Sequence, residues 1–306
     1  MNFYNHEGID LPKLGDSPIT SVATPDTPTP YNPSGWGQRC DMDMIKHARV
    51  PSQGPDTWRP LPHETFVGMI EQAFDRNGFT ISEPLHYRAK SVKNDKIKDL
   101  GEYGRFNTSY GIAHPLLPII DGVKWESGWL NSYDMTTSAQ GSLEKRTLIC
   151  GNGLTVDHSM ANFRRKHTSG IDQNRDGLFE HIYDLVNNTV GSLVTIAQAE
   201  ASRVDRYKQT ACNDSDARWV IMESAKRNVI GSAATMKVLE HFETPEHPEF
   251  KDGSVMCLEN AFTSDGRGRN MFTQKDRNSK LRDIIDERFG FGDSPNMTTG
   301  ELATNF

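Results

Sequence analysis

The chain has 306 residues, with 34 lysines and arginines against 41 aspartates and glutamates, a formal net charge of −7. This length suffices to bury a sizeable core in one large domain or two small ones. An acidic chain is not a general binder of polyanions, so a nucleic-acid site requires a local positive surface. No apolar run approaches the roughly 18 residues that span a bilayer, and no membrane contact is expected. The N-terminus lacks the blocks of a signal peptide and the four cysteines form no C-x-x-C pair, which favours a reducing cytoplasm.

Proline marks the first part of the chain, because ten of the 16 prolines precede residue 63. Proline restrains the backbone and has no N–H to donate, so this part cannot hold long helices or central strands. We expect an extended Pro-rich arm over residues 1–60, either laid over the fold or left as an unstructured tail. A single α+β domain is expected over residues 61–306.

Hydrophobic periodicity predicts one helix and then several strands. Between Leu61 and Asn77 the apolar residues fall on one helical face, and Gly78 is a natural stop. Four strand-like segments follow, namely Phe79–Lys90, Tyr103–Ala113, Val123–Tyr133 and Lys145–Cys150. The pair Asp121-Gly122 predicts a turn between two of them.

The second half of the chain has helical periodicity. Three helices are expected, over about residues 178–204 with a break near Gly191, over 215–242, and over 275–290. Pro245 and Pro248 end the second of them. Strands followed by helices favour an α+β fold, with an antiparallel-rich sheet from the first half and long helices from the second half packed on it.

Three stretches carry a net positive charge, although the chain as a whole is acidic. Arg88–Arg105 holds six cations and three anions, Glu144–Thr168 holds five and two, and Asp265–Arg282 holds six and two. Aromatic residues lie beside each stretch. Single-stranded nucleic acid is bound by cations that follow the phosphates and by flat side chains that stack on unpaired bases. The alternative is that the charges form solvated faces and that the aromatic residues belong to the core.

The nucleic-acid prediction names specific residues. The predicted polar contacts are Arg88, Lys90, Lys93, Lys96, Lys98, Arg105, Lys145, Arg146, Arg164, Arg165, Lys166, His167, Arg267, Arg269 and Lys275. The predicted stacking residues are Tyr103, Phe106, Phe163 and Phe272. The three consecutive cations from Arg164 to Lys166 are the densest group.

Motifs for metal binding or catalysis are incomplete. The segment Asp172–Gly177 fits the first half of a calcium loop, but Tyr183 stands where a bidentate glutamate is required, and a polar turn that caps a helix explains it equally well. Cys150 with His158 or His167 would suit nucleophilic catalysis, although a buried strand cysteine is the simpler reading. We therefore expect no enzyme activity, no metal and no cofactor.

Several short motifs resemble an uncharacterised family of phage and plasmid proteins. They are Asn131-Ser132-Tyr133-Asp134, then Thr147 to Gly153, then Arg164 to Thr168, and downstream Leu258 to Thr263. The resemblance covers residues 131 to 290 and implies an origin in a mobile element. The family has no settled activity.

More specifically, the chain resembles the single-stranded-DNA-binding RNA polymerase cofactors of podophages. This resemblance implies a non-enzymatic protein of the host cytoplasm that binds single-stranded DNA and a phage RNA polymerase, in transcription or replication. Two alternatives remain open. One is a metal-dependent, nuclease-like DNA-processing enzyme, which needs carboxylates beside the basic cluster. The other is a host-takeover protein that binds another protein through its Pro-rich arm. The sequence assigns no oligomeric state.

Overall fold

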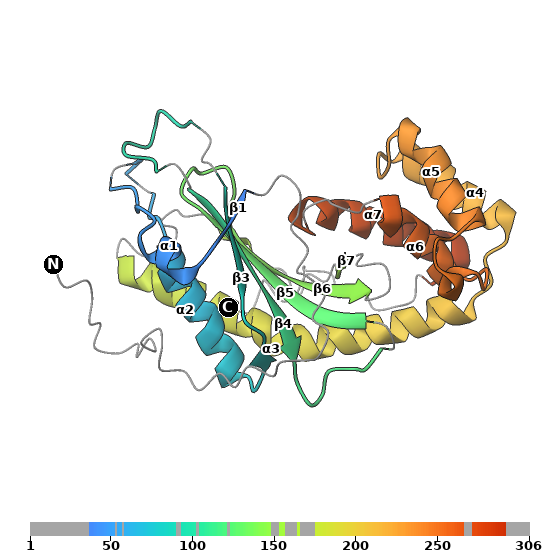
Figure 1. Cartoon of the computed structure of the whole chain (residues 1–306), viewed down its shortest axis with the longest axis horizontal. Coiled ribbons are helices and arrows are strands. Elements are labelled where there is room, and N and C mark those ends of the chain that lie inside the picture. The colour runs from blue at the N-terminus through green and yellow to red at the C-terminus, as the bar shows by residue number, and fades with distance from the viewer. Residues whose placement is uncertain are drawn as a thin grey trace.

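An antiparallel sheet followed by long helices forms the α+β fold that the sequence predicts (Figure 1). The computed structural model describes residues 37–52, 54–56, 58–89, 93–101, 104–120, 123–147, 153–156, 164–165, 175–265 and 271–291. None of the helices in these ranges is both long and apolar enough to cross a membrane.

The sheet has the order β1-β3-β4-β5-β6-β7, with β2 paired to β4 and β8 paired to β6. Its strands are β1 Gln38–Cys40, β2 Thr80–Ile81, β3 Leu85–Ala89, β4 Arg105–Ala113, β5 Val123–Ser132, β6 Ala139–Thr147, β7 Gly153–Val156 and β8 Arg164–Arg165. The expected strands in segments 79–90, 103–113 and 123–133 are confirmed, the first of them as two strands. The fourth begins earlier than expected, at Ala139, and the predicted Asp121-Gly122 turn lies outside the described residues.

Eight helical segments accompany the sheet in the described part of the chain. They are α1 Met42–Lys46, α2 His63–Arg76, α3 Arg175–Gln209, α4 Asp214–Lys226, α5 Ser232–Glu243, the short 3-10 helix η2 Pro248–Phe250, α6 Val255–Asp265 and α7 Met271–Phe289. The predicted helix of segment 61–77 is α2, and the expected last helix is α7.

The predicted break near Gly191 is wrong, because α3 is one helix of 35 residues. Gly191 instead allows α2 to approach closely. A Cβ atom at Gly191 would lie 3.0 Å from Oδ1 of Asn77, and Nδ2 of Asn77 donates to Oδ1 of Asn187 over 3.1 Å. The glycine therefore serves helix packing and not helix termination.

The helix expected over residues 215–242 is two helices. The chain leaves the helical path after Lys226, where Asn228 has a positive φ of 58°. Val229 and Ile230 are buried beyond the turn, so their burial favours the interruption over a continuous helix. The sequence also gave no indication of α6, in which every residue from Val255 to Thr263 is buried.

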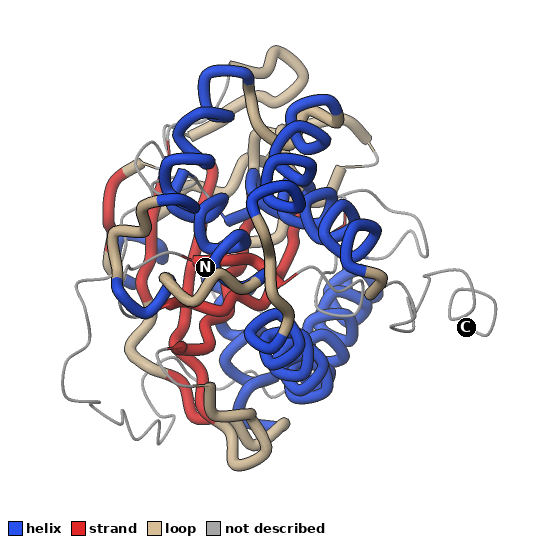
Figure 2. The backbone as a smooth tube through the Cα atoms, turned by 90° about the vertical axis from the view of Figure 1, so that its right-hand side faces the viewer, coloured by secondary structure: helices blue, strands red, loops and turns tan. Residues whose placement is uncertain are grey.

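Two large hydrophobic clusters, which α3 connects, form most of the interior of the described residues, and a third, small cluster surrounds Phe106. The first lies between one face of the sheet, α2 and the first half of α3, with Phe66, Phe74 and Trp129 fully buried. The second joins the end of α3 to α4, α5, α6 and α7. Figure 2, viewed from the right-hand side of Figure 1, shows these C-terminal helices in front of the strands.

Part of the Pro-rich segment contributes to the fold. β1 pairs with β3 at one edge of the sheet, while Trp58 and Leu61 are buried. The short α1 starts at an Asp41 cap, whose carboxylate accepts the N–H of Met44 over 2.8 Å. From residue 37 onward, the described residues of the segment lie against the domain.

Candidate nucleic-acid interface and a buried charge network

The sheet register brings two of the basic stretches to the same end of the sheet. Arg105 opens β4 and lies opposite Ala89 of β3 and Ser132 of β5. On β6, Ala139 lies opposite Arg165 and Gln140 opposite Arg164. Three strand spacings of about 4.8 Å separate β4 from β8, or about 14 Å in all. We call this region, where β3 and β5 end and β4 and β6 begin, the Arg105 end of the sheet.

Asp134 organises the Arg105 end. It follows β5 and is buried. Its Oδ1 accepts hydrogen bonds from Oγ of Ser132 over 2.7 Å, from the N–H of Thr136 over 3.1 Å, and from the hydroxyl of Thr136. Its Oδ2 lies 3.3 Å from Nε of Arg105, and its backbone carbonyl accepts a hydrogen bond from Nδ2 of Asn94 over 3.1 Å. One residue thus connects β4, the β5–β6 turn and the segment after β3.

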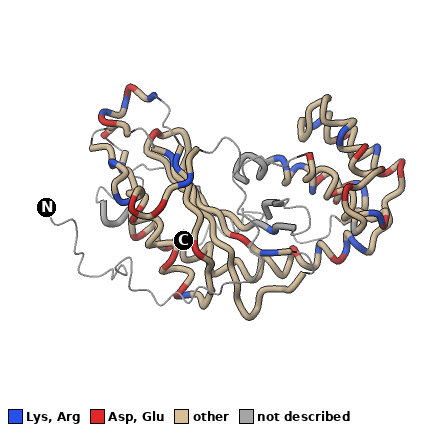
Figure 3. The backbone as a smooth tube through the Cα atoms, viewed as in Figure 1, with Lys and Arg blue, Asp and Glu red and all other residues tan. Residues whose placement is uncertain are grey.

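That last segment, residues 93–101, we call the lysine loop. Lys93, Lys96 and Lys98 are exposed, whereas Ile97 between them is only 5% exposed and anchors the loop. Figure 3 shows blue positions on this loop at the upper left. Lys93 pairs with Asp95 at 3.8 Å, but both side chains are almost fully exposed, so the pair contributes little to stability.

The segment Asn131–Tyr133, which directly precedes Asp134 in the chain, has a structural role. Nδ2 of Asn131 donates to the carbonyl of Leu61 over 2.8 Å, and the N–H of His63 at the start of α2 donates to the hydroxyl of Tyr133 over 2.8 Å. The His63 and Tyr133 rings stack 4.0 Å apart. Burial raises the pKa of Tyr133 well above its ordinary value, so the hydroxyl remains protonated.

Two predicted contact residues are corrected by their burial. The Phe106 side chain is fully buried beside Cys40, Ile45 and Val67, so no base can stack on its ring. Lys145 is 2% exposed and pairs with two carboxylates, so it is not available to a phosphate. Arg88 is half-buried, and its guanidinium donates to the carbonyl of Met44 over 3.4 Å.

The remaining predicted contacts are described in part or not at all. The backbone alone is described for Arg146, Arg164, Arg165, Phe272 and Lys275. The predicted contacts Lys90, Tyr103, Phe163, Lys166, His167, Arg267 and Arg269 lie outside the described residues, as do Cys150 and His158. The calcium-like segment is described only from Arg175 onward, where α3 begins.

The third basic stretch lies elsewhere on the sheet. Most of this stretch belongs to α7, which packs against β7. β7 in turn pairs with Leu143 to Arg146 of β6. The Arg164–Arg165 pair lies near the start of that strand instead. At about 3.4 Å per residue, the five residue steps from Gln140 to Lys145 separate the two places by about 17 Å.

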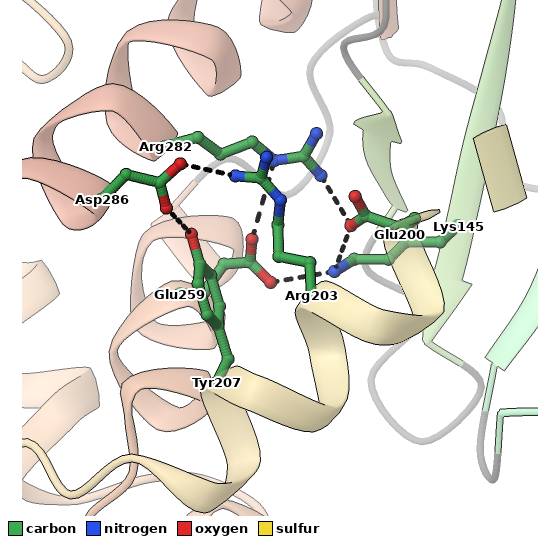
Figure 4. Close-up of polar contacts among 7 residues, drawn as sticks. All are labelled: Lys145, Glu200, Arg203, Tyr207, Glu259, Arg282 and Asp286. Carbon is green, nitrogen blue, oxygen red and sulfur yellow. Dashed lines mark hydrogen bonds and ion pairs between the residues drawn. The ribbon is translucent and has the colours of Figure 1, made fainter. Parts of the chain in front are cut away.

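Lys145 belongs to a buried charge network that links β6 to three helices (Figure 4). Its Nζ lies 2.8 Å from Oε1 of Glu200 on α3 and 2.9 Å from Oε2 of Glu259 on α6. Arg282 of α7 donates to the same Oε1 of Glu200 over 2.7 Å. At the outer side of the network Asp286 pairs with Arg203 and accepts a hydrogen bond from the hydroxyl of Tyr207, each at 3.1 Å.

The network balances three cations against three carboxylates in the interior. Burial alone would raise the pKa of Glu200, but the charges of Arg282, Lys145 and Arg203 outweigh burial and lower that pKa to about 2. Among the described residues no hydrogen bond reaches Oε2 of Glu200 or Oε1 of Glu259, although the latter atom lies 3.9 Å from Nε of Arg282. The network therefore stabilises the docking of α3, α6 and α7 on β6 only while all its charges are present.

The partners of Lys145 were missed in the sequence, although one signal was available. Glu259 stands inside the apolar run Val255 to Phe262, and a charge in a buried run requires a partner of opposite sign. No group of three or more histidine, cysteine, aspartate or glutamate side chains suited to a metal ion occurs among the described residues.

No protein-family model matches the chain. Comparison with curated proteins finds no significant match, and comparison with solved structures finds none either.

Proposed function

We propose that the protein binds single-stranded DNA through the Arg105 end of its sheet and the adjoining lysine loop. The observation that carries the proposal is the convergence of cations from distant parts of the sequence. By strand register, the backbone at Arg105 and at the Arg164–Arg165 pair lies at this end of the sheet, and Asp134 connects the lysine loop to Arg105.

The charge balance of the loop supports a role in binding phosphates. The described loop contains two anions, Asp95 and Asp99. Oδ2 of Asp99 lies 3.3 Å from Nη2 of Arg49 and accepts a hydrogen bond from Ser52, so Asp95 is the anion that remains to offset the lysines of the loop. Within the described residues Lys96 and Lys98 form no ion pair. On a chain of net charge −7, such a local excess of positive charge is what attracts a polyanion.

Single strands are proposed because stacking candidates stand next to both cationic segments. Tyr103 precedes Arg105 by two residues, and Phe163 directly precedes Arg164. Aromatic rings beside a cationic path suit unpaired bases more than a closed duplex. The resemblance to phage polymerase cofactors adds transcription or replication in a phage-infected host as the setting, with a phage RNA polymerase as protein partner.

The proposal predicts that Lys93→Ala/Lys96→Ala/Lys98→Ala binds a labelled oligothymidylate on the order of tenfold more weakly at low salt. Each lost phosphate contact reduces the slope of log affinity against log salt by about 0.7, so the triple variant reduces it by about 2. Fluorescence anisotropy at several salt concentrations measures both quantities.

A matched control removes three exposed lysines distant from the Arg105 end, as Lys208→Ala/Lys237→Ala/Lys251→Ala. It changes the net charge equally and should keep most of the affinity and the slope. Absence of binding by the wild type at micromolar protein and low salt would contradict the proposal. Shortening of the oligonucleotide in the presence of magnesium or manganese would favour the nuclease alternative instead.

A further inference from the structure

We infer that Asn94 is the positioning residue of the interface, holding the lysine loop in the conformation that contacts phosphates. The inference rests on the proposed function and adds to it a residue that carries no charge. Three exposed lysines within six residues repel one another, and a free loop loses conformational entropy when it is ordered on a ligand. A residue that orders the loop beforehand therefore raises affinity without contacting the DNA.

The two ends of the Asn94 side chain perform different tasks. Its Oδ1 accepts the N–H of Lys96 over 3.0 Å, and its backbone carbonyl accepts the N–H of Ile97 over 3.1 Å. These bonds close a local turn. Its Nδ2 points outward from the turn and donates to the carbonyl of Asp134 over 3.1 Å. Aspartate could close the turn but could not donate to Asp134, and serine is too short to do both.

Asp134 connects the lysine loop to Arg105. The carbonyl of Asp134 holds Asn94, and the carboxylate of the same residue holds the guanidinium of Arg105. The loop cations and the Arg105 end are thus fixed relative to each other through one buried residue.

Two other side-chain attachments of the loop, through Asp99 and Ile97, are less specific. The Arg49–Asp99 pair has side chains that are 65% and 43% exposed, and such pairs contribute little. Ile97 is buried, but an apolar contact lacks direction and does not determine which way the flanking lysines point. The hydrogen bond from the side-chain amide of Asn94 to the carbonyl of Asp134 is, by contrast, directional.

The test uses Asn94→Ala and Asn94→Ser, which keep every cation, and measures oligothymidylate binding across salt concentrations. We expect both variants to bind roughly threefold to tenfold more weakly, the factor that corresponds to one hydrogen bond. The salt slope should stay that of the wild type, because the lysines can still reach phosphates. Loss of the lysines themselves reduces the slope, so the two effects are separable.

A second measurement follows the loop without DNA. Limited trypsin digestion should cut after Lys93, Lys96 and Lys98 faster in the Asn94 variants than in the wild type. The matched control is Gln198→Ala, which also removes a hydrogen bond from a side-chain amide to a loop carbonyl, that of Leu116 over 3.2 Å. It should change neither the binding nor the digestion of the lysine loop.

The outcomes separate the inference from the proposed function. If the wild type binds no oligonucleotide, the proposed function fails and the inference fails with it. If the wild type binds and the Asn94 variants bind equally well, or if their loop is cut no faster, the inference alone is overturned.

Discussion

Lys145→Met is expected to lower the free energy of unfolding by about 3–5 kcal/mol. The substitution leaves the carboxylates of Glu200 and Glu259, which are 0% and 1% exposed, with Arg282 as the shared cation that remains in the described network, and Arg282 lies 3.9 Å from the nearest oxygen of Glu259. Burying an unpaired charge costs much more than a well-formed pair contributes. Urea denaturation followed by circular dichroism measures the loss.

A second substitution tests whether charge balance is the cause. Lys145→Met/Glu259→Gln restores equal numbers of cations and carboxylates among the remaining network residues, so it should be less destabilised than the sum of the two single variants. Lys208→Met, at an exposed position at the end of α3, is the control and should change stability by less than about 0.5 kcal/mol. A similarly small effect of Lys145→Met would contradict the network as described.

Gly141→Ala is the second substitution with a large expected effect. Gly141 of β6 lies opposite Trp129 of β5, and a Cβ atom there would lie 2.5 Å from Cζ3 of the fully buried indole. The ring cannot move away because it packs edge-on against Phe66 and Phe74, with centroid distances of 6.2 Å each. Overpacking of this kind costs about 1–3 kcal/mol.

A double-mutant cycle with Trp129→Phe isolates this contact. The smaller ring removes the colliding atoms, so Gly141→Ala should cost less in the Trp129→Phe background. Gly68→Ala in α2 is the control, since a Cβ at Gly68 meets nothing within 4 Å, and alanine in a helix should stabilise by up to about 1 kcal/mol. Equal costs of Gly141→Ala in both backgrounds would contradict the steric explanation.

The sheet and α2 could be predicted because their patterns are local. Alternation along β4 and β5 places Tyr110, Ile112, Trp125 and Trp129 in one cluster, and a period of two is readable within ten residues. α6 was missed for the opposite reason. All its residues from Val255 to Thr263 are buried, so no polar face reveals the helical period.

The candidate site shows the same division between local and long-range information. The positive charge of the lysine loop is visible in the sequence, but its attachment to Asp134 joins residues 40 positions apart. Lys145 was assigned to the nucleic-acid surface because it lies in a basic stretch. Strand alternation argues otherwise, because Lys145 has the same parity as Leu143, which is fully buried in the first cluster. Only the fold identifies Glu200 and Glu259 as its partners.

The most direct test of the proposed nucleic-acid interface is a lysine footprint on the full chain. The protein is acetylated briefly with and without saturating oligothymidylate, and each lysine is quantified by mass spectrometry. We expect oligothymidylate to protect Lys93, Lys96 and Lys98 and to leave exposed Lys237 and Lys251 unchanged. Equal labelling of the lysine loop in both conditions, with the oligonucleotide bound, would contradict the interface.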